Sequence, residues 1–144
     1  MDRDISVMLS TYNRAQFLKR TLEGFAETDR SDLSVEFMII DNGSSDNTRQ
    51  VIESFKNRMN IKYIFEPING KNRALNTAIE TCSLGDIVVF TDDDVDVPRN
   101  WLKSIHAVCQ RWPDHSLFGG RIDVVFPPVT IPQWSDDPMI AALA

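Results

Sequence analysis

Long apolar runs are absent from the sequence, since no stretch approaches the roughly 18 consecutive apolar residues of a membrane-spanning helix. The first residues, Met1–Asp4, also lack the apolar core of a secretory signal peptide. Cysteine is scarce. Cys82 and Cys109 lie in helix-like patterns without metal-ligand spacing, and we interpret them as reduced core residues. These absences predict a cytoplasmic protein with no transmembrane segment, either free or peripheral at the inner membrane face.

Positive charge is in deficit. The chain has 15 Lys and Arg against 21 Asp and Glu, a formal net charge of −6, which argues against nucleic-acid partners because phosphate neutralisation needs a basic surface. Two phosphate-binding signatures are also missing. The segment NGKN at 69–72 is not a Walker loop, and no G-x-G-x-x-G occurs. With 144 residues, the chain has the length of one domain with a substantial core.

The sequence does contain a regular alternation of strand-like and helix-like segments. Apolar, β-favouring runs predict strands at residues 5–9, 35–40, 61–65, 87–90 and 122–126. Apolar residues between them recur with a helical period, and Asn13, with Gln16 three residues on, is expected to cap the first helix. This alternation predicts an α/β fold with a mainly parallel sheet flanked by helices. The run 87–90 is apolar on both faces, which indicates a central strand.

The last part of the chain has a different composition. Residues 127–144 are rich in proline, as in loops rather than cores. We therefore expect an α/β domain over residues 1–126, followed by a proline-rich tail.

Polar side chains cluster where the expected strands end. Ser10–Arg14 follows the first strand, Asp41–Asn42 the second, Asn69–Arg73 comes shortly after the third, and Thr91–Asp94 follows the fourth. Ligands of open parallel sheets bind at the carboxyl ends of the strands. The four clusters therefore predict one binding site on this rim.

The aspartates after residue 90 need an explanation, because Asp92, Asp93, Asp94 and Asp96 repel one another. Two carboxylates about 4 Å apart repel by about 1 kcal/mol in water and about 4 kcal/mol near a protein surface. A hard divalent cation such as Mg²⁺ or Mn²⁺ would make the cluster favourable. The alternative is a solvated acidic loop that stabilises the N-terminus of the next helix.

Three other polar features suggest a nucleotide, although each also has a structural interpretation. Lys71 and Arg73, in the first turn of a helix after Gly70, could hold an anion such as a diphosphate, or could be two exposed cations. Asp41 could accept a base N–H or a ribose hydroxyl, or could start the Asn-Gly turn. Tyr12 could stack on a base or pack over the strand end. A nucleoside diphosphate with a metal fits all the clusters.

Four longer segments follow one another along the chain: SVMLSTYNRAQFLKRTLEGF, MIIDNGSSDNT, NGKNRALNTAIE and DIVVFTDDDVDVPRNWL. In order and spacing they resemble the family-2 glycosyltransferases, which have the GT-A fold, and the resemblance covers nearly all of residues 4–120. It implies inverting transfer of a sugar from a nucleotide-sugar donor, UDP-linked by preference, with Mg²⁺ or Mn²⁺. It also implies a carbohydrate or lipid-linked acceptor, as in polysaccharide biosynthesis.

The resemblance also implies roles for individual residues. Tyr12, with its neighbours Ser10, Thr11 and Asn13, would border the base, and Asp41 would accept a hydrogen bond from uracil. Arg73, or Lys71 nearby, would lie near the base and the phosphates. The acidic triplet would replace the family's D-x-D motif in one of two registers. Spacing from Pro98 puts Asp92 toward the ribose and Asp93 on the metal, whereas the literal D-x-D is Asp92 and Asp94; we expect Asp93 and Asp94 as metal ligands.

The chain departs from the family in length. Family members usually run well beyond 200 residues, and the second half supplies the acceptor site and a catalytic carboxylate. Asp136 and Asp137 come too early for that base, and we interpret them as loop residues. We expect this chain to be the donor-binding half, with exposed apolar surface that favours a homo-oligomer. Two alternatives are a non-catalytic nucleotide-diphosphate-binding module and a phosphatase of the haloacid dehalogenase type. The phosphatase is disfavoured because its nucleophile strand lies near the N-terminus.

Overall fold

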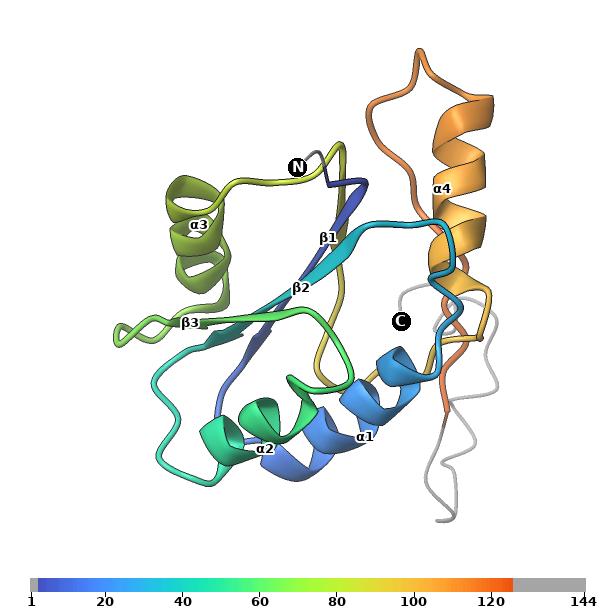
Figure 1. Cartoon of the computed structure of the whole chain (residues 1–144). Coiled ribbons are helices and arrows are strands. Elements are labelled where there is room, and N and C mark those ends of the chain that lie inside the picture. Colours follow the sequence, from blue (N-terminus) through green and yellow to red (C-terminus); the bar gives the residue numbers. More distant parts are fainter. Residues whose placement is uncertain (1–2, 126–144) are drawn as a thin grey trace, which may run out of the picture. The chain divides into compact units, whose positions relative to one another are not determined.

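The computed structural model describes residues 3–125, which contain four strands and four helices in strict alternation (Figure 1). The elements are β1 (Ile5–Thr11), α1 (Ala15–Ala26), β2 (Val35–Asp41), α2 (Thr48–Phe55), β3 (Ile61–Phe65), α3 (Lys71–Thr81), β4 (Ile87–Phe90) and α4 (Trp101–Arg111). The α/β alternation expected from the sequence is confirmed.

The four strands form one sheet in the order β3-β2-β1-β4, and all three neighbouring pairs are parallel. The register aligns the carboxyl ends, because Thr11 of β1 lies beside Asp41 of β2, which lies beside Phe65 of β3. The loops that follow these strands therefore leave the sheet along one edge.

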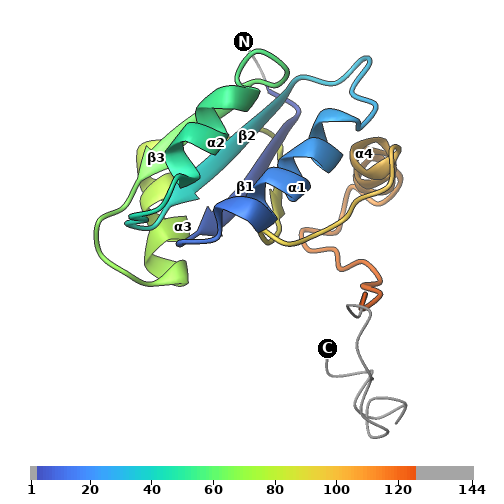
Figure 2. The same ribbon diagram turned by 90° about the horizontal axis from the view of Figure 1, so that it is seen from below.

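Helices cover both faces of the sheet, as Figures 1 and 2 show, with α1 and α2 side by side on one face and α3 on the other. The side chains of the strands alternate accordingly. Val7 and Leu9 of β1 pack with Leu22 and Phe25 of α1, whereas Met8 points to the other face and packs near Ala74 of α3. α4 contributes its buried Leu102 to the core that lies between the sheet and α1 and α2.

Two strands are central and buried on both faces. All seven residues of β2, and all but Ser10 of β1, are buried. The expectation that residues 87–90 form a central strand is wrong, because in the part of the chain that the structure describes β4 pairs only with β1. Phe90 is accordingly 57% exposed. An apolar run indicates that both faces of a strand are covered, but it does not indicate how many neighbouring strands pair with that strand.

The fifth strand expected at 122–126 is also not formed over its described residues. Residues 122–125 pair with no strand and are exposed, and an extended segment becomes a strand only through hydrogen bonds to a neighbour. The chain divides into two compact units, the first of which ends at Pro113. The expected domain boundary at 126, the proline-rich tail and both Asp136 and Asp137 lie outside the described residues.

No helix among residues 3–125 is long and apolar enough to cross a membrane.

Candidate functional site

The connection between β3 and β4 reverses the direction in which strands are added to the sheet. The chain runs from β1 to β2 to β3 in one direction, then crosses through α3 on the opposite face and returns to place β4 on the other side of β1. The loops after β1, β2 and β4 lead to helices on one face, and the loop after β3 leads to α3 on the other. Such a switch point, at the carboxyl ends of the strands, is where open α/β sheets bind ligands.

A pocket of about 400 Å³ opens at this switch point. It brings together residues from all four polar clusters that the sequence placed on one rim, which confirms their convergence. The lining residues are Ser10, Thr11, Tyr12, Arg14, Asn42, Asn69, Gly70, Lys71, Asp92 and Asp93.

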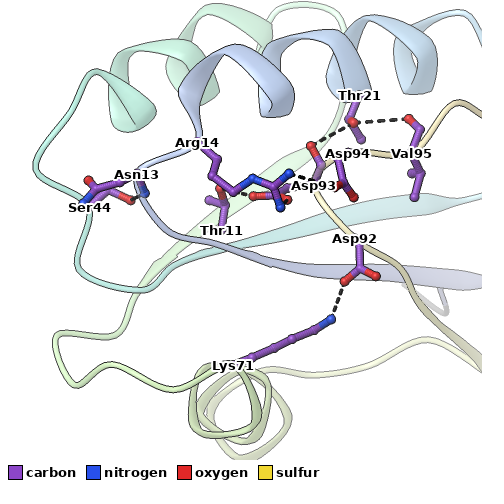
Figure 3. A network of polar contacts seen from close by, with 10 residues as sticks. All are labelled: Thr11, Asn13, Arg14, Thr21, Ser44, Lys71, Asp92, Asp93, Asp94 and Val95. Atoms are coloured by element: carbon purple, nitrogen blue, oxygen red, sulfur yellow. Dashed lines mark hydrogen bonds and ion pairs between the residues drawn. The ribbon is translucent and has the colours of Figure 1, made fainter. Parts of the chain in front are cut away.

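Asp93 is the buried member of the acidic triplet, with only 4% of its surface exposed. Its Oδ2 accepts a hydrogen bond of 2.7 Å from Thr11 Oγ1, and its Oδ1 lies 2.9 Å from a guanidinium nitrogen of Arg14 (Figure 3). Burial raises the pKa of Asp93, and the contacts with Thr11 and Arg14 partly offset that rise. Thr21 Oγ1 of α1 donates to the backbone carbonyl of Asp93 at 3.0 Å. Asp93 thus anchors the acidic loop to β1 and α1.

Asp94 and Asp92 point to opposite sides of this loop, and both are solvent-accessible (Figure 3). Asp94 Oδ2 lies 2.7 Å from the second terminal nitrogen of Arg14, so one guanidinium bridges Asp93 and Asp94. Asp92 pairs with Lys71 at the start of α3. The carboxylates avoid mutual repulsion because each faces a cation or a hydroxyl group.

The exposed carboxylates fit a hard divalent cation. Side chains of Asp92 and Asp94 are 53% and 43% exposed, and Mg²⁺ commonly binds proteins through one or two carboxylates while water and phosphate complete its shell. Within residues 3–125, no three His, Cys, Asp or Glu side chains form a group that could hold a metal by themselves. The donor set therefore suits a metal shared with a phosphate ligand, rather than an all-protein metal centre.

Asp41 lies at the end of β2 and is almost fully buried. Its Oδ2 accepts a hydrogen bond of 2.9 Å from the Tyr63 hydroxyl, and its Oδ1 accepts one of 2.8 Å from the Ser44 amide. Burial and the bond to Asp41 raise the pKa of Tyr63 to about 12. Asp41 is not among the residues that line the pocket, and the turn role considered for it is part of what it does.

Asn42 holds the loop that carries Lys71. Its buried side-chain amide donates to the backbone carbonyls of Glu66 (3.1 Å) and Ile68 (2.7 Å), and its Oδ1 accepts from the Gly70 amide at 2.7 Å. Gly70 has φ 142°, a conformation that L side chains rarely adopt. These contacts fix where α3 begins and so where Lys71 enters the pocket.

Arg73 points away from that pocket. Its Nε lies 3.5 Å from Glu66 Oε1, and it lines a separate pocket of about 390 Å³ with Asn76, Thr77 and Glu80 on α3. The hydrogen bond from Thr77, at 2.5 Å, is the main reason that the pKa of Glu66 is lowered. Of the two basic residues expected near the phosphates, only Lys71 lies in the pocket with the aspartates.

Asn13 does not cap α1, because the helix begins one residue later than expected, with Arg14 at the N-cap position. Asn13 instead takes a left-handed conformation, φ 52°, and its Oδ1 accepts a hydrogen bond of 2.8 Å from the Ser45 amide. Asp46 provides the cap from the neighbouring loop. Its Oδ2 accepts from the Ala15 amide at 3.2 Å, and its Oδ1 accepts from the Thr48 amide at 3.0 Å in α2. Hydrogen bonds between the β1–α1 loop and the β2–α2 loop thus hold the two loops together.

Ser10 and Tyr12 flank Thr11 at the mouth of the pocket. The Tyr12 ring is 47% exposed, which leaves it accessible for stacking.

Four residues line the pocket although the sequence reasoning assigned no role to them, namely Arg14, Asn42, Asn69 and Gly70. All four lie within recognised polar clusters, so their position was the available signal. Arg14 and Asn42 make the most contacts among them. The sequence did not reveal their partners. Asp94 lies 80 residues from Arg14, and Gly70 lies 28 residues from Asn42.

Comparisons with known proteins agree with this geometry. The sequence profile described as Glycosyl transferase family 2 matches residues 6–137. Validoxylamine A glucosyltransferase of Streptomyces hygroscopicus is 42% identical over 105 residues, which are 72% of this chain and 25% of that protein.

Two solved structures share the fold. Staphylococcus aureus TarS 1–349 with UDP-GlcNAc has a TM-score of 0.68 at 27% identity, covering 75% of this chain and 31% of that one. Mannosyltransferase PcManGT of Pyrobaculum calidifontis, with GDP-Man and Mn²⁺, has a TM-score of 0.61 at 28% identity, covering 71% and 33%. The chain thus spans about a quarter to a third of these relatives. With the profile matching most of its length, the chain belongs to glycosyltransferase family 2.

Proposed function

We propose that this chain binds the nucleotide-sugar donor of a glycosyltransferase, with a UDP-sugar as the favoured donor. The observation that carries the proposal is the switch-point pocket, which combines the cations Arg14 and Lys71 with the carboxylate Asp92. Cations match a diphosphate, and a carboxylate beside a diphosphate matches a bridging metal. The complexes of TarS with UDP-GlcNAc and of PcManGT with GDP-Man support a nucleotide sugar as ligand.

The base and ribose would lie against the loops after β1 and β2. The exposed Tyr12 would stack on the base, with Ser10 and Thr11 of the pocket lining beside it and Asn13 next in the chain. Asp41 would accept the uracil N–H, since an ionised carboxylate has about four lone-pair sites and two are used by Tyr63 and Ser44. Because Asp41 is buried and outside the pocket lining, the base could reach it only if the loop beside it moved.

Lys71 would bind the diphosphate, and Asp92 would bind the ribose or the metal. Lys71 offers three N–H donors to phosphate oxygens, and Asp92 offers an acceptor to a ribose hydroxyl or to the metal. Arg73 could join them only after leaving Glu66.

A bound Mg²⁺ or Mn²⁺ would supply positive charge to the diphosphate as it leaves the sugar. Mn²⁺ in the PcManGT complex supports this choice of cofactor. We assign Asp94 as the main ligand, and Asp92, on the other side of the loop, could join it only after leaving Lys71. Asp93 could bind the metal only by releasing Thr11 or Arg14, so we assign it chiefly to holding the loop.

We further propose inverting transfer to a carbohydrate or lipid-linked acceptor in the cytoplasm, as expected from the family resemblance. Such a reaction needs a base that deprotonates the acceptor hydroxyl. We assign this base to none of residues 3–125. The cations and carboxylates described above act on the donor alone.

Calorimetric titration of the 144-residue chain with UDP and with GDP, each with and without Mn²⁺, tests the proposal. We expect UDP to bind in the presence of Mn²⁺ and Asp94→Asn to weaken that binding by at least about tenfold. Asp96→Asn is the matched control, because Asp96 pairs with Arg20, whereas Asp94 pairs with Arg14 of the pocket lining. Equal UDP binding without metal would contradict the metal role, and no nucleotide binding would contradict the donor site. Detectable transfer from a UDP-sugar by the 144-residue chain would exclude the non-catalytic module and would contradict our assigning no base to residues 3–125.

A further inference from the structure

Arg14 stands between the predicted metal ligands and the predicted phosphate position. One terminal nitrogen lies 2.9 Å from Asp93 Oδ1, and the other lies 2.7 Å from Asp94 Oδ2. A planar guanidinium fork holds two carboxylates in a fixed geometry, which the three rotating donors of a lysine ammonium group do not provide. The bond to Asp94 is the main cause that raises the pKa of Arg14. The acidic loop thus already has a cation of its own.

A divalent cation on Asp94 cannot share that carboxylate with Arg14 without cost. The guanidinium and the metal would lie within a few ångströms of each other, where a unit charge and a double charge repel by about 2 kcal/mol even in water. The metal would therefore displace Arg14 from Asp94. Asp93 would not move with it, because Thr11 Oγ1 holds its other oxygen in a buried position.

The displaced guanidinium would remain in the pocket. The Arg14 backbone sits at the N-cap of α1, and Asn13 before it is hydrogen-bonded to Ser44 and Ser45. The guanidinium also lies over the Phe17 ring, 4.7 Å from its centroid, and its side chain is 41% exposed. The backbone is therefore fixed while the side chain can turn, and Arg14 already lines the pocket shared with Lys71.

We propose that Arg14 is an exchangeable counter-cation that neutralises Asp94 until a divalent metal takes that carboxylate, and then binds the diphosphate of the donor. This inference rests on the donor-binding function proposed above. Its consequence is coupling between two ligands, since metal binding frees a phosphate-binding group and phosphate binding removes a competitor of the metal.

Removing Arg14 should have opposite effects on the two ligands. For Arg14→Gln we expect Mn²⁺, titrated without nucleotide, to bind about fivefold more tightly, because a competing ion pair and a repulsion are lost. We expect UDP, titrated at saturating Mn²⁺, to bind about fivefold more weakly, because a charge-assisted hydrogen bond is lost. Calorimetry of the 144-residue chain measures both.

Arg20→Gln is the matched control. Arg20 lies on α1 and pairs with Asp96 of the same acidic loop, but it contacts neither Asp93 nor Asp94. We expect its Mn²⁺ and UDP affinities to equal those of the wild-type chain. If Arg20→Gln tightened Mn²⁺ binding as much as Arg14→Gln, a general charge effect would replace the proposed exchange.

Arg14→Lys separates exchange from loss of folding. It keeps the charge but not the fork, so we expect Mn²⁺ affinity between those of wild type and Arg14→Gln, with a thermal midpoint near that of wild type. Unchanged or weaker Mn²⁺ binding in both Arg14 variants, with UDP still bound in the presence of Mn²⁺, would overturn this inference alone. Absence of Mn²⁺ and UDP binding in the wild-type chain would overturn the donor-binding function with it.

Discussion

Thr11 Oγ1 donates a 2.7 Å hydrogen bond to Asp93 Oδ2, and this buried contact joins the end of β1 to the loop after β4. The two residues are 82 positions apart, on the two sides of the switch point. The bond sets which side chain of the acidic triplet turns inward. Asp92 and Asp94 then face outward, toward Lys71 and Arg14.

Thr11→Val should destabilise the fold. The substitution keeps the shape of the side chain but removes the donor, which leaves a buried carboxylate oxygen without its partner at a cost of about 1–3 kcal/mol. Urea unfolding measures the loss. Thr11→Ser, which keeps a hydroxyl, should recover most of it, and equal stability of the Val variant and wild type would show that Thr11 does not hold Asp93.

Asp46→Asn should weaken two helices at once. Asp46 accepts hydrogen bonds from the first turn of α1 through one oxygen and of α2 through the other, whereas an Asn side chain has a single acceptor oxygen and no charge to complement the helix dipoles. We expect a loss of about 1–2 kcal/mol in the free energy of unfolding. Asp32→Asn, at an exposed loop position, is the control. If the two variants lost the same free energy of unfolding, the hydrogen bonds from Asp46 to the two helices would not stabilise the fold.

Asn42→Asp should impair both stability and nucleotide binding. The change keeps the size of the side chain but removes the two N–H donors that hold the carbonyls of Glu66 and Ile68. We expect about 1–3 kcal/mol of destabilisation and weaker UDP binding, because the loop that places Lys71 is released. Urea unfolding and calorimetry test the two effects. Asn72→Asp, an exposed change of the same charge, should leave both unchanged.

Acid should weaken the ion pair between Asp29, in the loop after α1, and Lys103 of α4. The hydrogen bond from Lys103, together with Ser31, lowers the pKa of Asp29 from 3.8 to about 2. A carboxyl with a lowered folded-state pKa stabilises the fold above its unfolded value and loses that contribution as pH falls from about 4 to about 2. Urea unfolding of Asp29→Asn should therefore show a smaller loss of stability than wild type across this range. Parallel pH profiles of the two proteins would contradict the assignment.

The arrangement of elements could be predicted from the sequence because it depends on short-range patterns. Apolar residues two or about four positions apart fix strands and helices, and the loops after parallel strands must meet at one edge. The four polar clusters therefore converged as expected, and Lys71 and Asp92 share the pocket.

The finer parts of the site depend on contacts that no local pattern contains. Asp92, Asp93 and Asp94 are identical in sequence terms, and only the Thr11 hydroxyl distinguishes the middle one. Lys71 and Arg73 are two positions apart on a helix, so they face different directions. The cap of α1 comes from Asp46, 31 residues away, rather than from the residues beside it.

The edge position of β4 has a consequence for how the domain opens. Ile87 and Thr91 donate their amides to β1, so the alternate amides of β4 face outward, where hydrogen exchange with solvent needs little disruption. Such an edge releases before the doubly paired β1 and β2 do. The carboxylates that follow β4 are thus carried by an edge strand, whose local opening costs less than that of β1 or β2, and a ligand that ties Asp94 to the pocket should slow exchange across β4.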